Sequence, residues 1–118
     1  ALSQLNTPSA LNLAARILGE DQRWVDALDK ISQAIALKPD PQTLIRTWNT
    51  QARILLDQAA AGDSSALAKA DQALRESEAL DEGNSFTMLL WAEWLEQSHD
   101  SRAAAVRGQA EALRRIEL

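Results

Sequence analysis

The stretch that decides the fold is WVDALDKISQAIALKP, which runs from Trp24 to Pro39. Its apolar side chains recur at intervals of three and four residues and therefore share one face of an α-helix: Ala27, Leu28, Ile31, Ala34 and Ile35. Pro39 ends the segment, because a proline ring cannot continue a helix. We therefore predict an amphipathic helix, from about Arg23 to Leu37, that packs by one side.

The composition of the whole chain favours the same kind of structure. The 118 residues are 46% apolar, which suffices for the core of a single domain over residues 1–118. Three prolines, four glycines, one phenylalanine and no tyrosine accompany abundant alanine and leucine. Because strands favour β-branched and aromatic residues, which are few here, we predict an all-α fold.

Five further segments carry helical signals. Thr7 with Pro8 and Asp40 with Pro41 each place a capping side chain before a proline in the first turn. The six predicted helices span about 8–19, 23–37, 41–62, 64–81, 85–96 and 101–117, with Asp63 or Ser64 capping the fourth and Asn84 or Ser85 capping the fifth.

Short links join these helices, so neighbouring helices are expected to run antiparallel as three hairpins. The approximate units are residues 8–40, 41–83 and 84–118. One such hairpin buries too little apolar surface to be stable alone, and stacking of successive hairpins is the expected solution.

The first unit resembles the tetratricopeptide (TPR) repeat, a helix–turn–helix unit of about 34 residues. The resemblance rests on the type and spacing of nine residues: Leu11, Ala14, Ala15, Leu18, Trp24, Ala27, Ile31, Ala34 and Pro39. The later units are degenerate copies, with Glu82 at the position of the closing proline and Arg107 at a normally bulky one. The resemblance implies a short right-handed α-solenoid of about three TPR-like units.

In TPR proteins the first helices of the hairpins line a concave groove that binds a partner segment. The resemblance carries this role onto nine residues: Asn12, Arg16, Arg46, Thr50, Arg53, Phe86, Leu89, Leu90 and Glu93. Such a groove is basic at one end and apolar at the other, and it suits a protein segment with an acidic portion and a hydrophobic anchor. The alternative for the arginines is that they are solvated or pair with nearby carboxylates. The basic residues of the TPR carboxylate clamp are absent, since Phe86 and Leu90 occupy their positions.

The four tryptophans allow two interpretations, an aromatic ligand cage or core packing. Trp24, Trp48 and Trp91 lie on the apolar stripes of their predicted helices, which favours the core. Trp94 lies about 60° around the helix from Trp91. We expect it either at the surface beside the apolar end of the groove or packed against the sixth helix.

Several functional classes find no support in the sequence. A net charge of −5 argues against nucleic acid as the main partner. No apolar run approaches the roughly 18 residues of a membrane span, so no membrane insertion is expected. The absence of cysteine fits a soluble protein of the cytoplasm or the periplasm equally well. His99 stands alone in a polar link, and no catalytic motif appears, so we expect no enzyme, no metal and no cofactor.

Three functions are compatible with these observations. A protein–protein interaction module, a scaffold or adaptor, follows from the TPR resemblance. A sensory or regulatory domain that binds a small ligand in the groove is the first alternative. A homo-oligomerisation domain, associating through Phe86, Leu89, Leu90 and Trp94, is the second. The arginines of the last helix indicate either a second interaction face or, as we favour, a polar capping helix.

Overall fold

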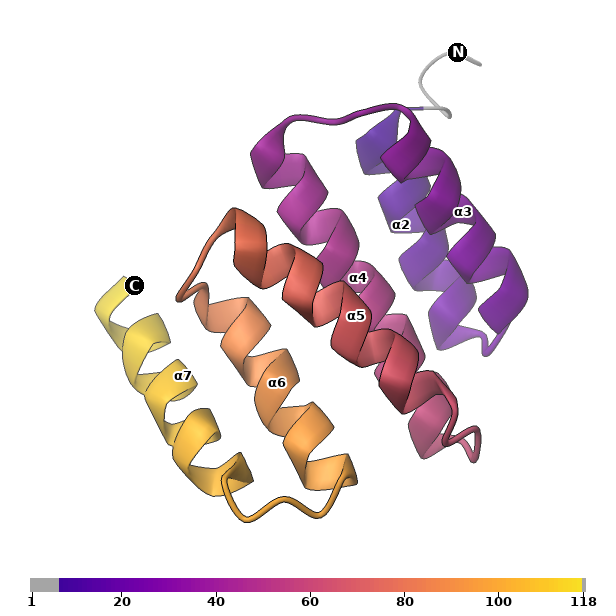
Figure 1. The fold of residues 1–118 in the computed structure, drawn as a ribbon. Helices are drawn as coiled ribbons and strands as arrows, with labels where there is room; N and C mark the ends of the chain where they lie inside the picture. Colours follow the sequence, from indigo (N-terminus) through magenta and orange to yellow (C-terminus); the bar gives the residue numbers. More distant parts are fainter. Residues whose placement is uncertain (1–6, 118) are drawn as a thin grey trace.

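A computed structural model describes residues 7–117, which form six α-helices and no β-strand. The helices are α2 (Pro8–Glu20), α3 (Trp24–Ala36), α4 (Pro41–Ala60), α5 (Ala66–Leu80), α6 (Ser85–Gln97) and α7 (Ala103–Glu117). The predicted all-α class is confirmed for this part of the chain. Figure 1 shows the helices pairing in chain order as antiparallel neighbours, α2 with α3, α4 with α5 and α6 with α7.

Helix starts follow from local hydrogen bonds. Thr7 accepts from the backbone N–H of Ala10, and Asp40 accepts from that of Thr43 at 2.8 Å, in each case just before the proline that opens the helix. The bond from Thr43 also holds the pKa of Asp40 below its usual value. Both cap predictions are therefore confirmed.

The start of α5 differs from the prediction. The capping position belongs to Ser65, rather than to Asp63 or Ser64. The Asp63 carboxylate accepts from the backbone N–H of Ser65 at 3.2 Å, so it organises the turn that precedes the helix. Asn84 caps α6 as predicted, accepting from the backbone N–H groups of Phe86 and Thr87.

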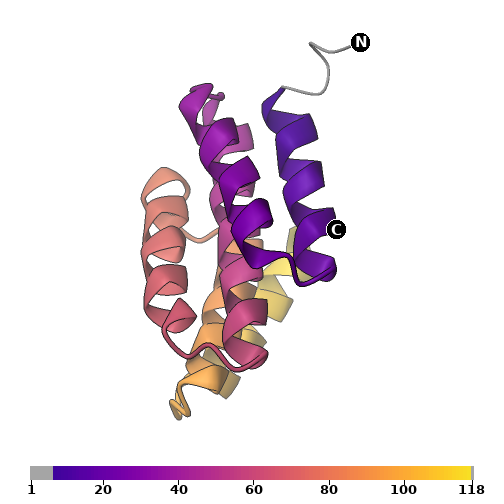
Figure 2. The same cartoon turned by 90° about the vertical axis from the view of Figure 1, so that its right-hand side faces the viewer.

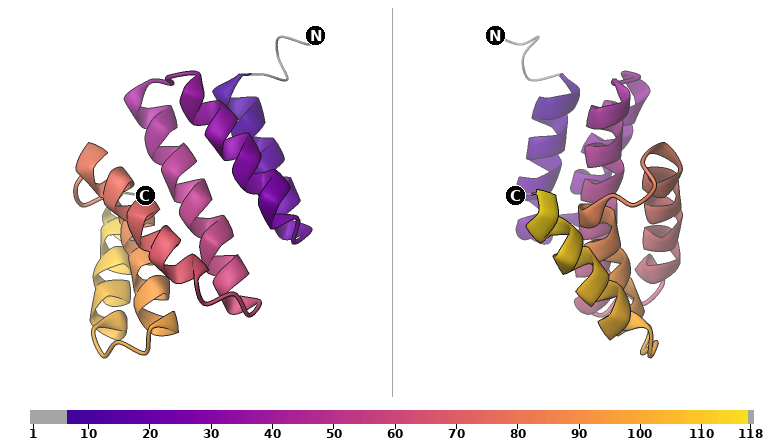
Figure 3. Two further views of the ribbon diagram at one scale, coloured as in Figure 1. Left: turned by 45° about the vertical axis from the view of Figure 1, so that its right-hand side comes forward. Right: turned by 90° about the vertical axis from the view of Figure 1, so that its left-hand side faces the viewer.

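Helix α4 is the element around which the others are arranged. It contacts α2, α3, α5 and α6, whereas α7 packs on α6 alone. Figures 2 and 3 show the consequence: α5 lies on one side of the molecule, and α2 and α7 lie on the other, with α4 and α6 between them.

The core divides into three clusters of buried side chains, and α4 contributes to each of them. Ile54 packs with α2 and α3, Leu55 and Leu56 pack with the start of α5, and Ala52 packs with Ala73 and Leu74 further along α5. Because successive residues of a helix point in different directions, one helix can serve neighbours on several sides. The first two hairpins are thereby joined through a single helix.

The tryptophans pack against these clusters. Trp24 lies on the first cluster, and Trp48 and Trp91 lie on the third, as predicted. Trp94 also packs on the second and third clusters and donates its indole N–H to the carbonyl oxygen of Leu67 at 2.7 Å. Trp94 is half-buried against α5 and does not line the groove, so the expectation that placed it at the surface beside the groove is wrong.

Gly19 allows α2 and α4 to approach closely. A Cβ atom at this position would lie 3.0 Å from Cγ1 of Ile54, which is nearer than an ordinary van der Waals contact. We expected Gly19 to mark the helix end, but α2 continues to Glu20. The absence of a side chain at Gly19 serves packing instead.

The core position of Leu74 gives a stability prediction. Its side chain is fully buried, whereas Leu80 on the same helix is 41% exposed. We expect Leu74→Ala to lower the free energy of unfolding by about 2–5 kcal/mol, because it removes transfer energy and leaves a cavity. Leu80→Ala is the matched control and should cost roughly 1 kcal/mol or less. Urea unfolding followed by circular dichroism measures both, and equal losses would contradict the core assignment.

Candidate binding groove

An open groove of about 510 Å³ runs across α2, α4 and α6. Its lining consists of Asn12, Arg16, Ile45, Arg46, Asn49, Thr50, Arg53, Asn84, Phe86, Leu89 and Leu90. All the residues predicted to face the groove except Glu93 are in this lining, and Glu93 contacts it through Arg53. Side chains from three helices far apart in the sequence are thus brought to one surface.

The helical repeat explains why α4 contributes most of the floor. Arg46, Asn49 and Arg53 follow at intervals of three and four residues and so share one face of α4. Asn49 was not among the predicted groove residues, although this spacing was sufficient to identify it. Ile45 and Asn84, which also line the groove, were not predicted either.

Thr50 lines the groove, but its hydroxyl group is hydrogen-bonded within α4. Its side chain is 9% exposed, and its hydroxyl group donates to the carbonyl oxygen of Arg46 at 2.9 Å. The hydroxyl proton is therefore engaged within α4 itself. Thr50 contributes shape to the groove floor more than a free hydrogen-bond donor.

Arg53 does not lie free in the groove. Its guanidinium group donates to both carboxylate oxygens of Glu93, at 3.0 Å for the Nη1–Oε1 contact, and to Asp57 at 2.9 Å. These bonds join α4 to α6 and compensate the positive charge. The alternative considered from the sequence, that a groove arginine pairs with nearby carboxylates, applies to Arg53.

Unlike Arg53, the other two groove arginines, Arg16 and Arg46, form no ion pair between residues 7 and 117. Both are exposed on the groove, and neither forms an ion pair with a carboxylate in the described part of the chain. Arginine offers paired N–H donors in a fixed plane, and the charge of Arg46 is balanced only in part by the nearby Asp40 carboxylate. The α2–α4 side of the groove therefore carries two guanidinium groups that form no ion pair in the described part of the chain.

The opposite side of the groove is apolar and aromatic. Phe86 is 55% exposed, and Leu89 and Leu90 are half-buried beside it. The guanidinium carbon of Arg114 lies 4.6 Å from the centre of the Phe86 ring, in a cation–π contact. Arg114 belongs to α7, and no periodicity in the sequence indicated that it would reach the groove.

Asn12 supplies a hydrogen-bonding atom with no partner. Its Oδ1 atom is buried and accepts no hydrogen bond within the described residues. A buried acceptor in this condition costs free energy, because it has lost its hydrogen bond to water without gaining another. The groove thus combines two guanidinium groups outside any ion pair of the described residues with an apolar wall on the opposite side.

Comparisons with known proteins do not place the chain in a family. No family model matches the sequence, and no curated protein or solved structure matches it. None of the helices between residues 7 and 117 has the length and apolar character to cross a membrane. In the same part of the chain, no three His, Cys, Asp or Glu side chains are grouped to hold a metal ion.

The Arg53–Glu93 pair gives a testable prediction about how the groove is held. Its side chains are 42% and 28% exposed, so solvent screens part of the attraction. We expect a double-mutant cycle with Arg53→Ala and Glu93→Ala to give a coupling energy of about 0.5–1 kcal/mol in urea unfolding.

The exposed pair Arg23–Asp26 is the control cycle, with side chains 60% and 53% exposed. Its coupling energy should be about 0.3 kcal/mol or less. A coupling at Arg53–Glu93 no larger than this control would show that the pair does not join α4 to α6 energetically.

Proposed function

We propose that the chain is a protein–protein interaction module whose three hairpins stack as a short right-handed TPR-like solenoid. In this proposal the groove across α2, α4 and α6 binds a segment of a partner protein. The observation that supports it best is that residues selected by the repeat pattern line a single open groove. A scaffold or adaptor role follows from such a surface.

The partner segment is expected to combine acidic residues with an apolar anchor. Arg16 and Arg46 form no ion pair within the described residues, although the chain as a whole carries a charge of −5. Phe86 and Leu89 offer apolar surface on the other side of the groove. Burial of an apolar anchor supplies free energy, while carboxylates facing the arginines set orientation and register.

The shape of the groove favours this proposal over the two alternatives. The groove is open along its length, which suits an extended segment better than an enclosed small ligand. A homo-oligomer built on Phe86, Leu89, Leu90 and Trp94 would need these residues on one surface, but Trp94 packs on α5 instead. We therefore propose neither alternative.

A peptide titration tests the proposal. Fluorescein-labelled peptides of twelve residues, with Glu and Asp in one half and Leu and Phe in the other, are titrated and followed by fluorescence anisotropy. We expect binding, and we expect Arg16→Ala and Arg46→Ala each to weaken it by roughly 3- to 10-fold, because each removes a charge-assisted contact. Arg115→Ala on the exposed side of α7 is the matched control and should leave the affinity unchanged.

Peptides of the same length with Lys in place of Glu and Asp provide the reverse test. Equal binding of acidic and basic peptides, or an equal loss in the Arg115→Ala variant, would contradict the proposed groove. The affinity for the acidic peptides should also fall as salt rises, because exposed charges are screened within about 8 Å at physiological ionic strength.

A further inference from the structure

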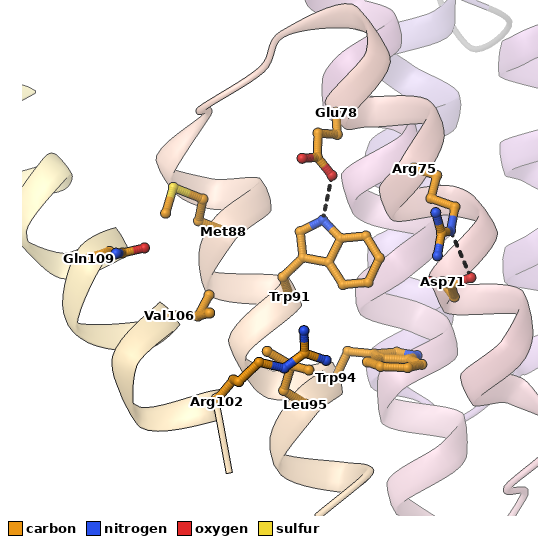
Figure 4. A pocket seen from close by; sticks show the side chains of 10 residues that line it. All are labelled: Asp71, Arg75, Glu78, Met88, Trp91, Trp94, Leu95, Arg102, Val106 and Gln109. Atoms are coloured by element: carbon orange, nitrogen blue, oxygen red, sulfur yellow. Dashed lines mark hydrogen bonds and ion pairs between the residues drawn. The ribbon is translucent and has the colours of Figure 1, made fainter. Parts of the chain in front are cut away.

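A second cavity, of about 440 Å³, lies between α5 and α7 over the outer face of α6. We call it the tryptophan cleft, and its lining consists of Asp71, Arg75, Glu78, Met88, Trp91, Trp94, Leu95, Arg102, Val106 and Gln109. Figure 4 shows the Trp91 ring in the middle of the cleft, with Glu78 from α5 above it and Val106 and Gln109 from α7 to one side. The proposed function leaves this site unused.

The tryptophan cleft and the groove lie on opposite sides of α6. Met88, Trp91 and Leu95 point into the cleft, and the helical repeat places them about half a turn away from Phe86 and Leu89 in the groove. Helix α6 is therefore apolar all round. A helix of this kind is normally covered on every side, but α5 and α7 do not pack against each other over it.

The two indole rings are held in fixed positions. Trp91 and Trp94 meet edge to face, with ring centres 5.8 Å apart and an interplanar angle of 81°. The indole N–H of Trp94 donates to the carbonyl oxygen of Leu67 at 2.7 Å, and that of Trp91 donates to the Glu78 carboxylate at 3.1 Å. Because both polar N–H groups are engaged, the aromatic wall offered to a ligand is apolar and preorganised.

The charges around the cleft leave one carboxylate uncompensated. Arg75 pairs with Asp71 at 3.0 Å, and Arg102 pairs with Asp100 at 2.8 Å. The hydrogen bonds from Arg102 lower the pKa of Asp100 to about 2, so this pair remains ionised at neutral pH. Glu78 has no cationic partner in the described part of the chain and lies against Trp91.

We propose that the tryptophan cleft binds a small organic cation with an alkylated ammonium group, which lies against the Trp91 ring beside Glu78. The negative face of an indole ring attracts a cation, and it does so best when the cation carries apolar substituents that leave water readily. The Glu78 carboxylate supplies the opposite charge. The volume of the cleft is in the range of small-molecule sites, which fits such a ligand.

Other classes of ligand would make fewer favourable contacts in the cleft. An anion would have to bind Arg75 or Arg102, which also line the cleft, but Asp71 and Asp100 already pair with them, and it would lie near the Glu78 carboxylate. A neutral apolar molecule would contact the rings but would gain nothing from Glu78. A cation with a compact, strongly hydrated charge would lose its water without gaining apolar contact with Trp91 and Trp94.

Choline and its neutral isostere 3,3-dimethylbutan-1-ol test the proposal, because the two molecules share a shape and differ in charge. The indole ¹H–¹⁵N signals of the intact chain are followed during each titration, with Trp91 assigned from the Trp91→Phe variant. We expect choline to shift the Trp91 and Trp94 signals saturably and to leave Trp24, in the first core cluster, unmoved. The isostere should bind roughly tenfold more weakly.

Glu78→Gln removes the charge but keeps an oxygen that can accept from Trp91. We expect it to weaken choline binding by roughly fivefold or more while circular dichroism stays unchanged. Glu76→Gln is the matched control on the same helix, because Glu76 lies outside the cleft and is hydrogen-bonded to Gln72. This variant should bind choline as tightly as the unaltered chain does. The proposal is overturned if choline moves neither indole, if the isostere binds as well as choline, or if the two variants bind alike.

Discussion

The packing of α4 is the constraint on which the rest of the structure depends. Ala52, Ile54 and the Leu55–Leu56 pair lie on different sides of this one helix and belong to three separate core clusters. Gly19 lets α2 approach α4 closely enough for Ile54 to fill the space between them. Because α4 contacts four of the other five described helices, a change in its core would displace several neighbours at once.

The same helix creates the groove. When one set of α4 residues is buried in the core, the helical repeat leaves Arg46, Asn49 and Arg53 together on another face. Arg53 then joins this face to α6 through Glu93, which leaves Arg16 and Arg46 as the groove arginines without an ion pair in the described part of the chain. Core packing and the shape of the groove are therefore linked through the geometry of α4, and α6 supplies the apolar wall on the opposite side.

Local patterns predicted much of the fold, because helix caps and apolar stripes depend on residues close together in the chain. The caps at Thr7, Asp40 and Asn84 are examples. Contacts between distant elements were harder to predict, since they depend on how α7 leaves α6. The Arg114–Phe86 contact follows from that placement, and the packing of Trp94 on α5 follows from how α5 and α6 lie against each other. The groove residues were predicted by their repeat positions, but the pairing of Arg53 with Glu93 required the relative orientation of two helices.

Mapping a bound peptide onto the chain tests most directly whether the α2–α4–α6 face is the binding surface. Backbone ¹H–¹⁵N signals are followed while an unlabelled peptide with an acidic half and a Leu/Phe half is added. We predict that the largest shifts fall on groove positions of α2, α4 and α6, with those near Arg16 and Arg46 responding to the acidic half and those near Phe86 to the apolar half. Shifts concentrated on the outer faces of α3 and α5, with the groove unmoved, would contradict this assignment.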